Sequence, residues 1–185
     1  AIKFENLKTI FFSQSTNFAD ALCSTINNYY RDNNIVTDTI PCVVYHSQLQ
    51  TLIYTDSSGK QKKKGKVVLK REAIENIRTG RARRISTASS LDKGFDVQDI
   101  KLGVTTSGTQ NPTQASQRKG RSIRIDFYEK DNTVLIINLY VPNTVDEYWL
   151  KKRQSKGKNT VYWIKDVDKI TYTPKNNNWL EGNTI

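Results

Sequence analysis

The chain has 185 residues, of which 29 are lysine or arginine and 18 are aspartate or glutamate, so its net charge is +11. Hydrophobic residues make up 36% of the sequence, including three Trp, nine Tyr and six Phe, which suffices for one folded domain and excludes disorder throughout. No apolar run reaches the roughly 18 residues of a membrane-spanning helix, and Lys3, Glu5 and Lys8 interrupt the first apolar stretch, so we expect no signal peptide.

The first part of the chain predicts one helix and two strands. Apolar residues at three- and four-residue spacing predict a helix over residues 17–31, capped by Asn17 or Thr16. Residues 40–45 and 49–54 are rich in β-branched and aromatic side chains and predict strands.

The middle of the chain is more polar. A Gly-Lys loop leads to a predicted short strand at residues 67–69 and a helical turn at residues 73–77. Residues 86–90 and 105–116 are rich in Ser, Thr, Gly and Gln and read as loops on either side of a strand at residues 97–104.

Alternating apolar residues predict a β-hairpin over residues 121–141. Its second strand, residues 133–141, is apolar on both faces, which is typical of a strand in the middle of a sheet. A short helix is predicted at residues 146–153, and a last hairpin pairs residues 161–164 with residues 169–172.

These elements predict a β-rich α+β fold with an N-terminal helix and a mixed or antiparallel sheet. We expect one domain over residues 1–175 and a loose tail at residues 176–185. Within the domain, residues 60–84 form a basic segment and residues 104–120 form a long polar loop, which in a compact domain indicates function or disorder.

The basic segment dominates the charge distribution. It holds eleven basic residues against Glu72 and Glu75, and like charges at this density repel one another unless a partner neutralises them. Its candidate phosphate-binding residues are Lys62, Lys63, Lys64, Lys66, Arg78, Arg81, Arg83 and Arg84.

Two further basic clusters follow. The candidate residues in them are Arg118, Lys119 and Arg121, and then Lys151, Lys152, Arg153, Lys156 and Lys158 with the aromatic Trp149. Lysine and arginine neutralise phosphates, and aromatic rings can stack on unpaired bases. The sequence has no zinc-finger spacing and no aromatic RNA-recognition motif, so we expect contacts with the phosphate backbone and weak sequence specificity.

The prediction for function is therefore a non-catalytic protein that binds DNA or RNA and needs no cofactor. Abundant Asn, Lys, Ile and Tyr indicate an AT-rich coding source, which suits a structural or packaging component of a virus or mobile element. A virion or assembly protein whose basic surface contacts protein partners is an alternative, and an acidic membrane surface would also suit the charge.

A metal-dependent nuclease is the other alternative. The segment from Asp96 to Lys101, with Asp99 two residues before Lys101, resembles the strand-borne Asp-x-Lys of the PD-(D/E)xK nuclease superfamily. The resemblance implies a Mg²⁺ site built from Asp96 and Asp99, with Lys101 near the attacking water and a further carboxylate from Glu72 or Glu75. The Pro-Asp pair of an earlier strand in that superfamily is not found.

The cysteine and histidine residues do not form a metal-binding pattern. Cys42 and His46 are four residues apart, but a four-ligand zinc site would need two more ligands at suitable spacing. Cys23 and Cys42 lie in apolar stretches and are expected to be buried free thiols, and His46 is expected to be structural. This cysteine usage favours a location inside a cell or a virion.

Overall fold

The computed structural model describes residue 4, residues 6–88, residue 97, residues 99–106, residues 134–154 and residues 163, 164, 166, 168 and 170; for residues 153 and 154 it describes only the backbone. The helices and strands in these ranges are β1 (Thr9–Ser13), α1 (Thr16–Asp32), β2 (Val43–Tyr45), β3 (Leu52–Thr55), β4 (Gln61–Lys64), α2 (Lys66–Arg78), β5 (Arg84–Ala88), β6 (Leu102–Thr105), β7 (Leu135–Asn138) and α4 (Val145–Gln154).

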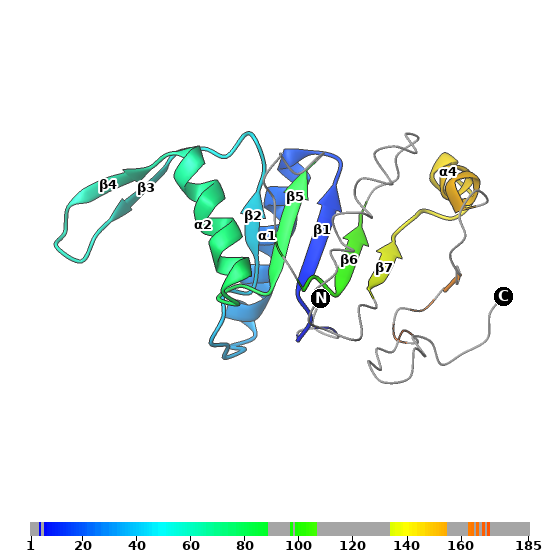
Figure 1. Cartoon of the computed structure of the whole chain (residues 1–185), viewed down its shortest axis with the longest axis horizontal. Helices are drawn as coiled ribbons and strands as arrows, with labels where there is room; N and C mark the ends of the chain where they lie inside the picture. The colour runs from blue at the N-terminus through cyan, green and yellow to red at the C-terminus, as the bar shows by residue number, and fades with distance from the viewer. Residues whose placement is uncertain are drawn as a thin grey trace.

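Five strands form one parallel sheet in the order β2-β5-β1-β6-β7 (Figure 1). Strand β1 lies at its centre and pairs with β5 on one side and β6 on the other. The only antiparallel pair in the described ranges is β3 with β4, which forms a separate hairpin. The prediction of a β-rich α+β fold with a mixed or antiparallel sheet is therefore wrong, because the main sheet is parallel and belongs to an α/β fold.

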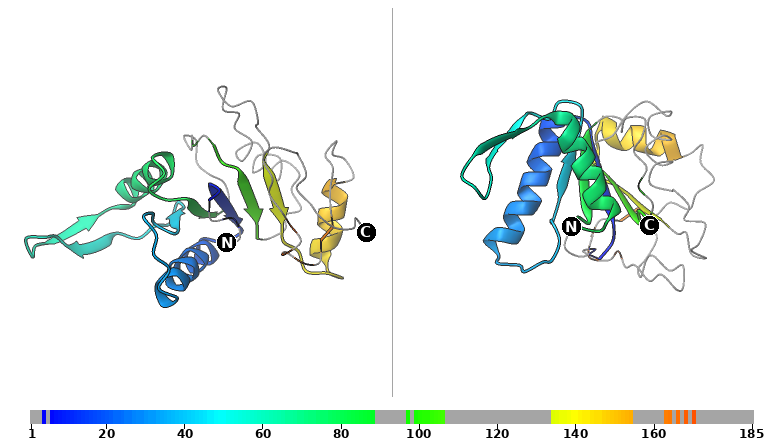
Figure 2. Two further views of the ribbon diagram at one scale, coloured as in Figure 1. Left: turned by 90° about the horizontal axis from the view of Figure 1, so that it is seen from below. Right: turned by 60° about the vertical axis from the view of Figure 1, so that its left-hand side comes forward.

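Helices α1 and α2 cover opposite faces of the sheet (Figure 2). Helix α1 connects β1 to the edge strand β2, whereas α2 connects β2 back to β5, so the two crossovers run in opposite directions. Because parallel crossovers are right-handed, opposite directions place the two helices on opposite faces.

Each face of the sheet has its own apolar core. Ile10 and Phe12 of β1 pack with Ile77 of α2 in one cluster. Phe11, between them in the sequence, packs with Cys23, Ile26 and Tyr30 of α1 in the other. Since successive side chains of a strand point to opposite faces, one short apolar run supplies both cores.

Two central strands are missing from the sequence prediction. Strand β1 is a run of five buried residues without the alternation of a half-exposed strand. Strand β5 is buried along its whole length although it contains Arg84, Ser86 and Thr87, and the Ser and Thr residues of the segment led to the prediction of a loop at residues 86–90. Strand β7 is the last strand of the sheet within the described residues, but the segment predicted to pair with it lies outside them, so the position of residues 133–141 in mid-sheet stays a prediction.

The helix predictions are confirmed in part. Helices α1 and α4 match the predicted ranges, but the N-cap of α1 is Ser15, whose hydroxyl accepts a hydrogen bond from the Phe18 N–H at 3.2 Å. The predicted strand at residues 67–69 is wrong, because these residues lie in α2, and the predicted Gly-Lys loop contains β4.

Several predictions fall outside the described residues. They concern the first strand and the turn of the hairpin at residues 121–132, most of the polar loop at residues 104–120 and the tail at residues 176–185. None of the helices in the described ranges has the length and apolar character needed to cross a bilayer.

Candidate nucleic-acid interface

The carboxyl ends of the five parallel strands lie at one edge of the sheet (Figure 1). In open α/β sheets ligands bind outside this edge, near the strand at which the chain changes direction. Here that strand is β1, since the chain first crosses to β2 at one end of the sheet and later adds β6 and β7 at the other. The carboxyl edge around β1 is therefore the first candidate surface.

Small polar residues occupy this edge. Ser13 and Thr105 end their strands, Thr87 is the last residue but one of β5, and all three are buried. Thr106 donates its backbone N–H and its hydroxyl to the Phe12 carbonyl, at 3.0 and 3.1 Å. The hydroxyl of Thr87 has no hydrogen-bond partner within the described residues. An unpaired buried polar group costs about 1–3 kcal/mol, so the described part of this edge contains a polar group that lowers the stability of the fold.

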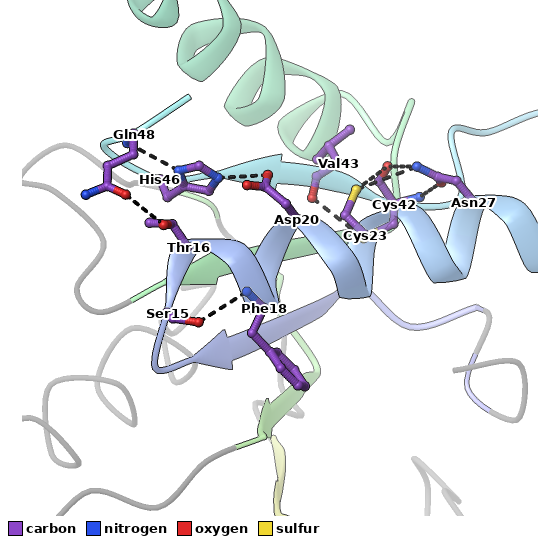
Figure 3. Close-up of polar contacts among 10 residues, drawn as sticks. All are labelled: Ser15, Thr16, Phe18, Asp20, Cys23, Asn27, Cys42, Val43, His46 and Gln48. Atoms are coloured by element: carbon purple, nitrogen blue, oxygen red, sulfur yellow. Dashed lines mark hydrogen bonds and ion pairs between the residues drawn. The ribbon is translucent and has the colours of Figure 1, made fainter. Parts of the chain in front are cut away.

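The start of α1 is fixed to the segment after β2 (Figure 3). The Thr16 hydroxyl donates to Gln48 Oε1 at 2.8 Å. His46 is buried, its Nδ1 accepts from the Gln48 N–H at 3.2 Å, and its Nε2 lies 2.9 Å from Asp20 Oδ1. These contacts select the tautomer that carries its proton on Nε2 and donates it to Asp20. His46 therefore has a structural role, as expected.

The two cysteines hold α1 against β2. Both are free and buried, in agreement with the sequence prediction. Cys23 donates to the Cys42 carbonyl at 3.4 Å, and the Asn27 side chain exchanges hydrogen bonds with the Cys42 backbone N–H and carbonyl at 2.9 and 3.0 Å (Figure 3). The hydrogen bond with Cys23 and burial raise the pKa of Cys42, which keeps it a thiol.

The second candidate surface is the β3–β4 hairpin, which leaves the carboxyl end of β2 and projects beyond this edge strand (Figure 1). Its turn is organised by Asp56, whose Oδ1 accepts from the Ser58 N–H, the Ser58 hydroxyl and the Lys60 N–H at 2.9, 2.6 and 3.0 Å. Gly59 completes the turn with a φ of +79°, a conformation that favours glycine.

The turn should open in acid. Hydrogen bonds from Ser58, the Lys62 ammonium and the Lys60 backbone lower the pKa of Asp56 from 3.8 to about 2. A carboxylate with a lowered pKa stabilises the fold above its unfolded pKa and loses that contribution as the pH falls towards its folded pKa. We therefore expect the amide protons of Ser58 and Lys60 to lose hydrogen-exchange protection between pH 4 and pH 2, as measured by NMR.

The Asp56→Asn variant is the control, because it cannot titrate and should show no such step over this range. Equal loss of protection in the variant and in the original protein would contradict the assignment to Asp56.

The predicted lysines of the basic segment lie on this hairpin and at its base. Lys62, Lys63 and Lys64 belong to β4, and Lys66 begins α2. Lys62 pairs with Asp56 at 2.9 Å, and Lys64 pairs with Glu72 of α2 at 2.7 Å.

The arginines of the basic segment lie at the other end of α2, a helix about 20 Å long. Arg78 ends the helix and lies 3.8 Å from Glu75, while Arg81 is exposed. Arg83 donates to the Asn6 carbonyl at 3.1 Å. Arg84 is buried, donates to the Pro41 carbonyl at 3.2 Å and lies over the Tyr30 ring. The structure therefore does not bring these arginines together with the hairpin lysines.

Part of the third basic cluster lies on α4. Lys151 pairs with Glu147 at 2.5 Å and lies over the Trp163 ring, and Lys152 lies over the exposed Tyr148 ring. Hydrogen bonds from Lys151 and the Asn143 N–H lower the pKa of Glu147. The predicted stacking residue, Trp149, is half-buried.

The other basic candidates lie outside what the structure describes. These are Arg118, Lys119, Arg121, Lys156 and Lys158, together with the side chain of Arg153.

The residues of the nuclease alternative are not seen together. Asp99 lies before β6, between Lys8 at 3.8 Å and Lys101 at 3.6 Å, while Glu72 is paired with the hairpin. Asp96 is outside the described residues. No group of three acidic, histidine or cysteine residues suited to a metal ion occurs in the part of the chain that the structure describes.

Sequence reasoning missed the carboxyl edge of the sheet. A short apolar run followed by Ser13, Ser15 and Thr16 is the signal that could have revealed it, because a capping hydroxyl directly after a buried strand is typical of a strand-to-helix turn.

The sequence of residues 2–126 matches the model of a protein family, the helicase conserved C-terminal domain. No curated protein sequence matches the chain. Among solved structures, the chain is similar to the C-terminal domain of Dbp5 from S. cerevisiae bound to Gle1 and IP6, with a TM-score of 0.51 and 16% identity over 80% of this chain and 68% of that one.

The chain is also similar to domain 2 of the DEAD-box helicase Mss116p bound to an RNA duplex, with a TM-score of 0.53 and 14% identity over 82% of this chain and 48% of that one. A third similar structure is the helicase domain of Pyrococcus furiosus Hef, with a TM-score of 0.50 and 17% identity over 82% of this chain and 25% of that one. Because the sequence identities are only 14–17%, the three structures show the fold alone, which is that of a RecA-like α/β domain.

Proposed function

Since the chain belongs to the helicase conserved C-terminal domain family, we propose that it is the nucleic-acid-binding domain of an ATP-dependent helicase. The family agrees with the prediction of nucleic acid as the partner. It gives no support to the predicted viral, virion or structural role, nor to the nuclease alternative. The absence of a resident cofactor and a location inside a cell or a virion remain predictions.

The observation that carries the proposal is the match over residues 2–126 together with the five-stranded parallel sheet. This architecture offers a ligand surface at the carboxyl ends of its strands. Backbone N–H groups at the start of α1 lie at this edge, and N–H groups at the N-terminus of a helix suit phosphate. We propose that a nucleic-acid strand crosses this edge.

The charge of the chain supports the same partner. Phosphate contacts release counter-ions, so the affinity of such a domain depends steeply on salt. The basic hairpin leaves the sheet at its carboxyl edge, which is the edge that we propose the nucleic-acid strand crosses. The net charge of +11 would also draw a polyanion towards the surface from a distance.

Binding to labelled single- and double-stranded DNA and RNA across a salt series tests this function. We expect the logarithm of the association constant to fall linearly with the logarithm of the salt concentration, with a slope that corresponds to about five or more phosphate contacts. The absence of binding at low salt would refute the proposal. Cleavage of the probe on addition of Mg²⁺ would instead favour the nuclease alternative.

A further inference from the structure

The register of the β3–β4 hairpin divides its side chains between two faces. Leu52 pairs with Lys64 and Tyr54 with Lys62, so these four side chains share one face. The other face has the four remaining residues of the two strands, all of them exposed: Ile53, Thr55, Gln61 and Lys63. Adjacent lysines of β4 therefore point in opposite directions.

The acidic residues near the hairpin neutralise lysines only on the face that carries Lys62 and Lys64. Asp56 pairs with Lys62 at 2.9 Å, and Glu72 pairs with Lys64 at 2.7 Å. Lys64 also lies 5.2 Å from the centre of the Tyr54 ring. Within the described residues, no acidic partner is found for Lys63, for Lys60 at the turn or for Lys66 at the base.

The paired lysines instead give the hairpin a defined shape. The Lys64–Glu72 pair joins the hairpin to α2, and the hydrogen bond that Lys64 donates to Glu72 raises the pKa of Lys64, which favours its charged form. The Asp56 network orders the turn at the other end. A preorganised surface loses less conformational entropy when it binds.

The residues at the base of the hairpin destabilise the N-terminus of α2. Gly65, the N-cap of α2, provides no side-chain cap, and the first turn has no acidic residue. Lys66 instead places a cation at the positive end of the helix dipole, where a charge of this sign destabilises the helix. A phosphate beside Lys66 would relieve this repulsion.

We propose that the Lys63 face of the hairpin, with Lys60 and Lys66 at its ends, binds the phosphate backbone of the nucleic acid beyond the edge of the main sheet. This inference rests on the proposed function and adds a second contact surface to it. The contact is with phosphate and is insensitive to base identity, since Tyr54, the one aromatic residue of β3 and β4, lies beneath Lys64 on the opposite face.

The test compares Lys63→Ala with Lys62→Ala, its neighbour on the opposite face. Both variants lose one positive charge from the same strand, so a general effect of net charge would affect them equally. We expect Lys63→Ala to weaken binding severalfold and to reduce the salt slope by about 0.9 for duplex DNA or about 0.7 for a single strand. Lys62→Ala should leave the slope unchanged.

Fluorescence anisotropy with labelled single-stranded and duplex DNA and RNA supplies the affinities, and thermal unfolding checks that both variants fold. Equal effects of the two substitutions, or no effect of Lys63→Ala while the original protein binds, would refute the inference and leave the proposed function standing. If the original protein does not bind at all, the proposed function fails and the inference fails with it.

Discussion

Replacement of Ile10 by alanine is expected to lower the free energy of unfolding by about 2–5 kcal/mol. Ile10 is in the central strand β1, between Ile85 of β5 and Gly103 of β6, and its side chain is fully buried. The substitution would leave a cavity below α2 that this close-packed core cannot fill. Urea unfolding followed by circular dichroism measures the change.

Ile53→Ala is the matched control, because it removes the same atoms from a side chain that is 57% exposed on the hairpin. We expect it to change the stability by no more than about 0.5 kcal/mol. Equal effects of the two substitutions would contradict a sheet centred on β1.

Arg84→Ala is expected to destabilise the protein by about 2–4 kcal/mol. The Arg84 side chain is 2% exposed, donates to the Pro41 carbonyl and lies 5.4 Å from the centre of the Tyr30 ring. Its loss would leave the carbonyl without this donor and remove a cation–π contact from the α1 side of the sheet. Thermal and urea unfolding measure the effect.

Arg81→Ala removes the same charge from an exposed position three residues earlier and should leave the stability within about 0.5 kcal/mol of the original. Arg84→Met, which retains much of the apolar packing, should recover part of the loss. A large effect of Arg81→Ala together with a negligible effect of Arg84→Ala would show that the two side chains have been assigned the wrong environments.

Local patterns predicted the helices of this fold better than its sheet. Helix α1 has a clear 3.6-residue period and was placed within one residue at each end. Strand β5 could not be identified in this way, because Arg84, Ser86 and Thr87 look like loop residues until neighbouring strands and helices cover them. The parallel direction of the sheet follows from pairings between distant segments, and no local pattern records such pairings.

The candidate site shows the same division between local and tertiary information. The net charge pointed to a polyanionic partner, and the structure places the predicted lysines on an exposed hairpin. Lys62, Lys63 and Lys64 are equivalent in composition. They differ in the face on which they lie, which the pairing register sets, and in their ion pairs with Asp56 and Glu72. Likewise, only the tertiary structure distinguishes the buried Arg84 from the exposed Arg81.

The central position of β1 has a consequence for how the protein folds. Thr9 pairs with Arg84 and with Leu102, so the middle of the sheet is assembled from segments far apart along the chain. Such a high contact order slows folding, because long loops must close before their pairings become favourable. During synthesis on the ribosome, the apolar side chains of β1 remain exposed until the segments that form β5 and β6 have been made. We therefore expect folding to begin with the local elements α1 and the β3–β4 hairpin, and the sheet to close last.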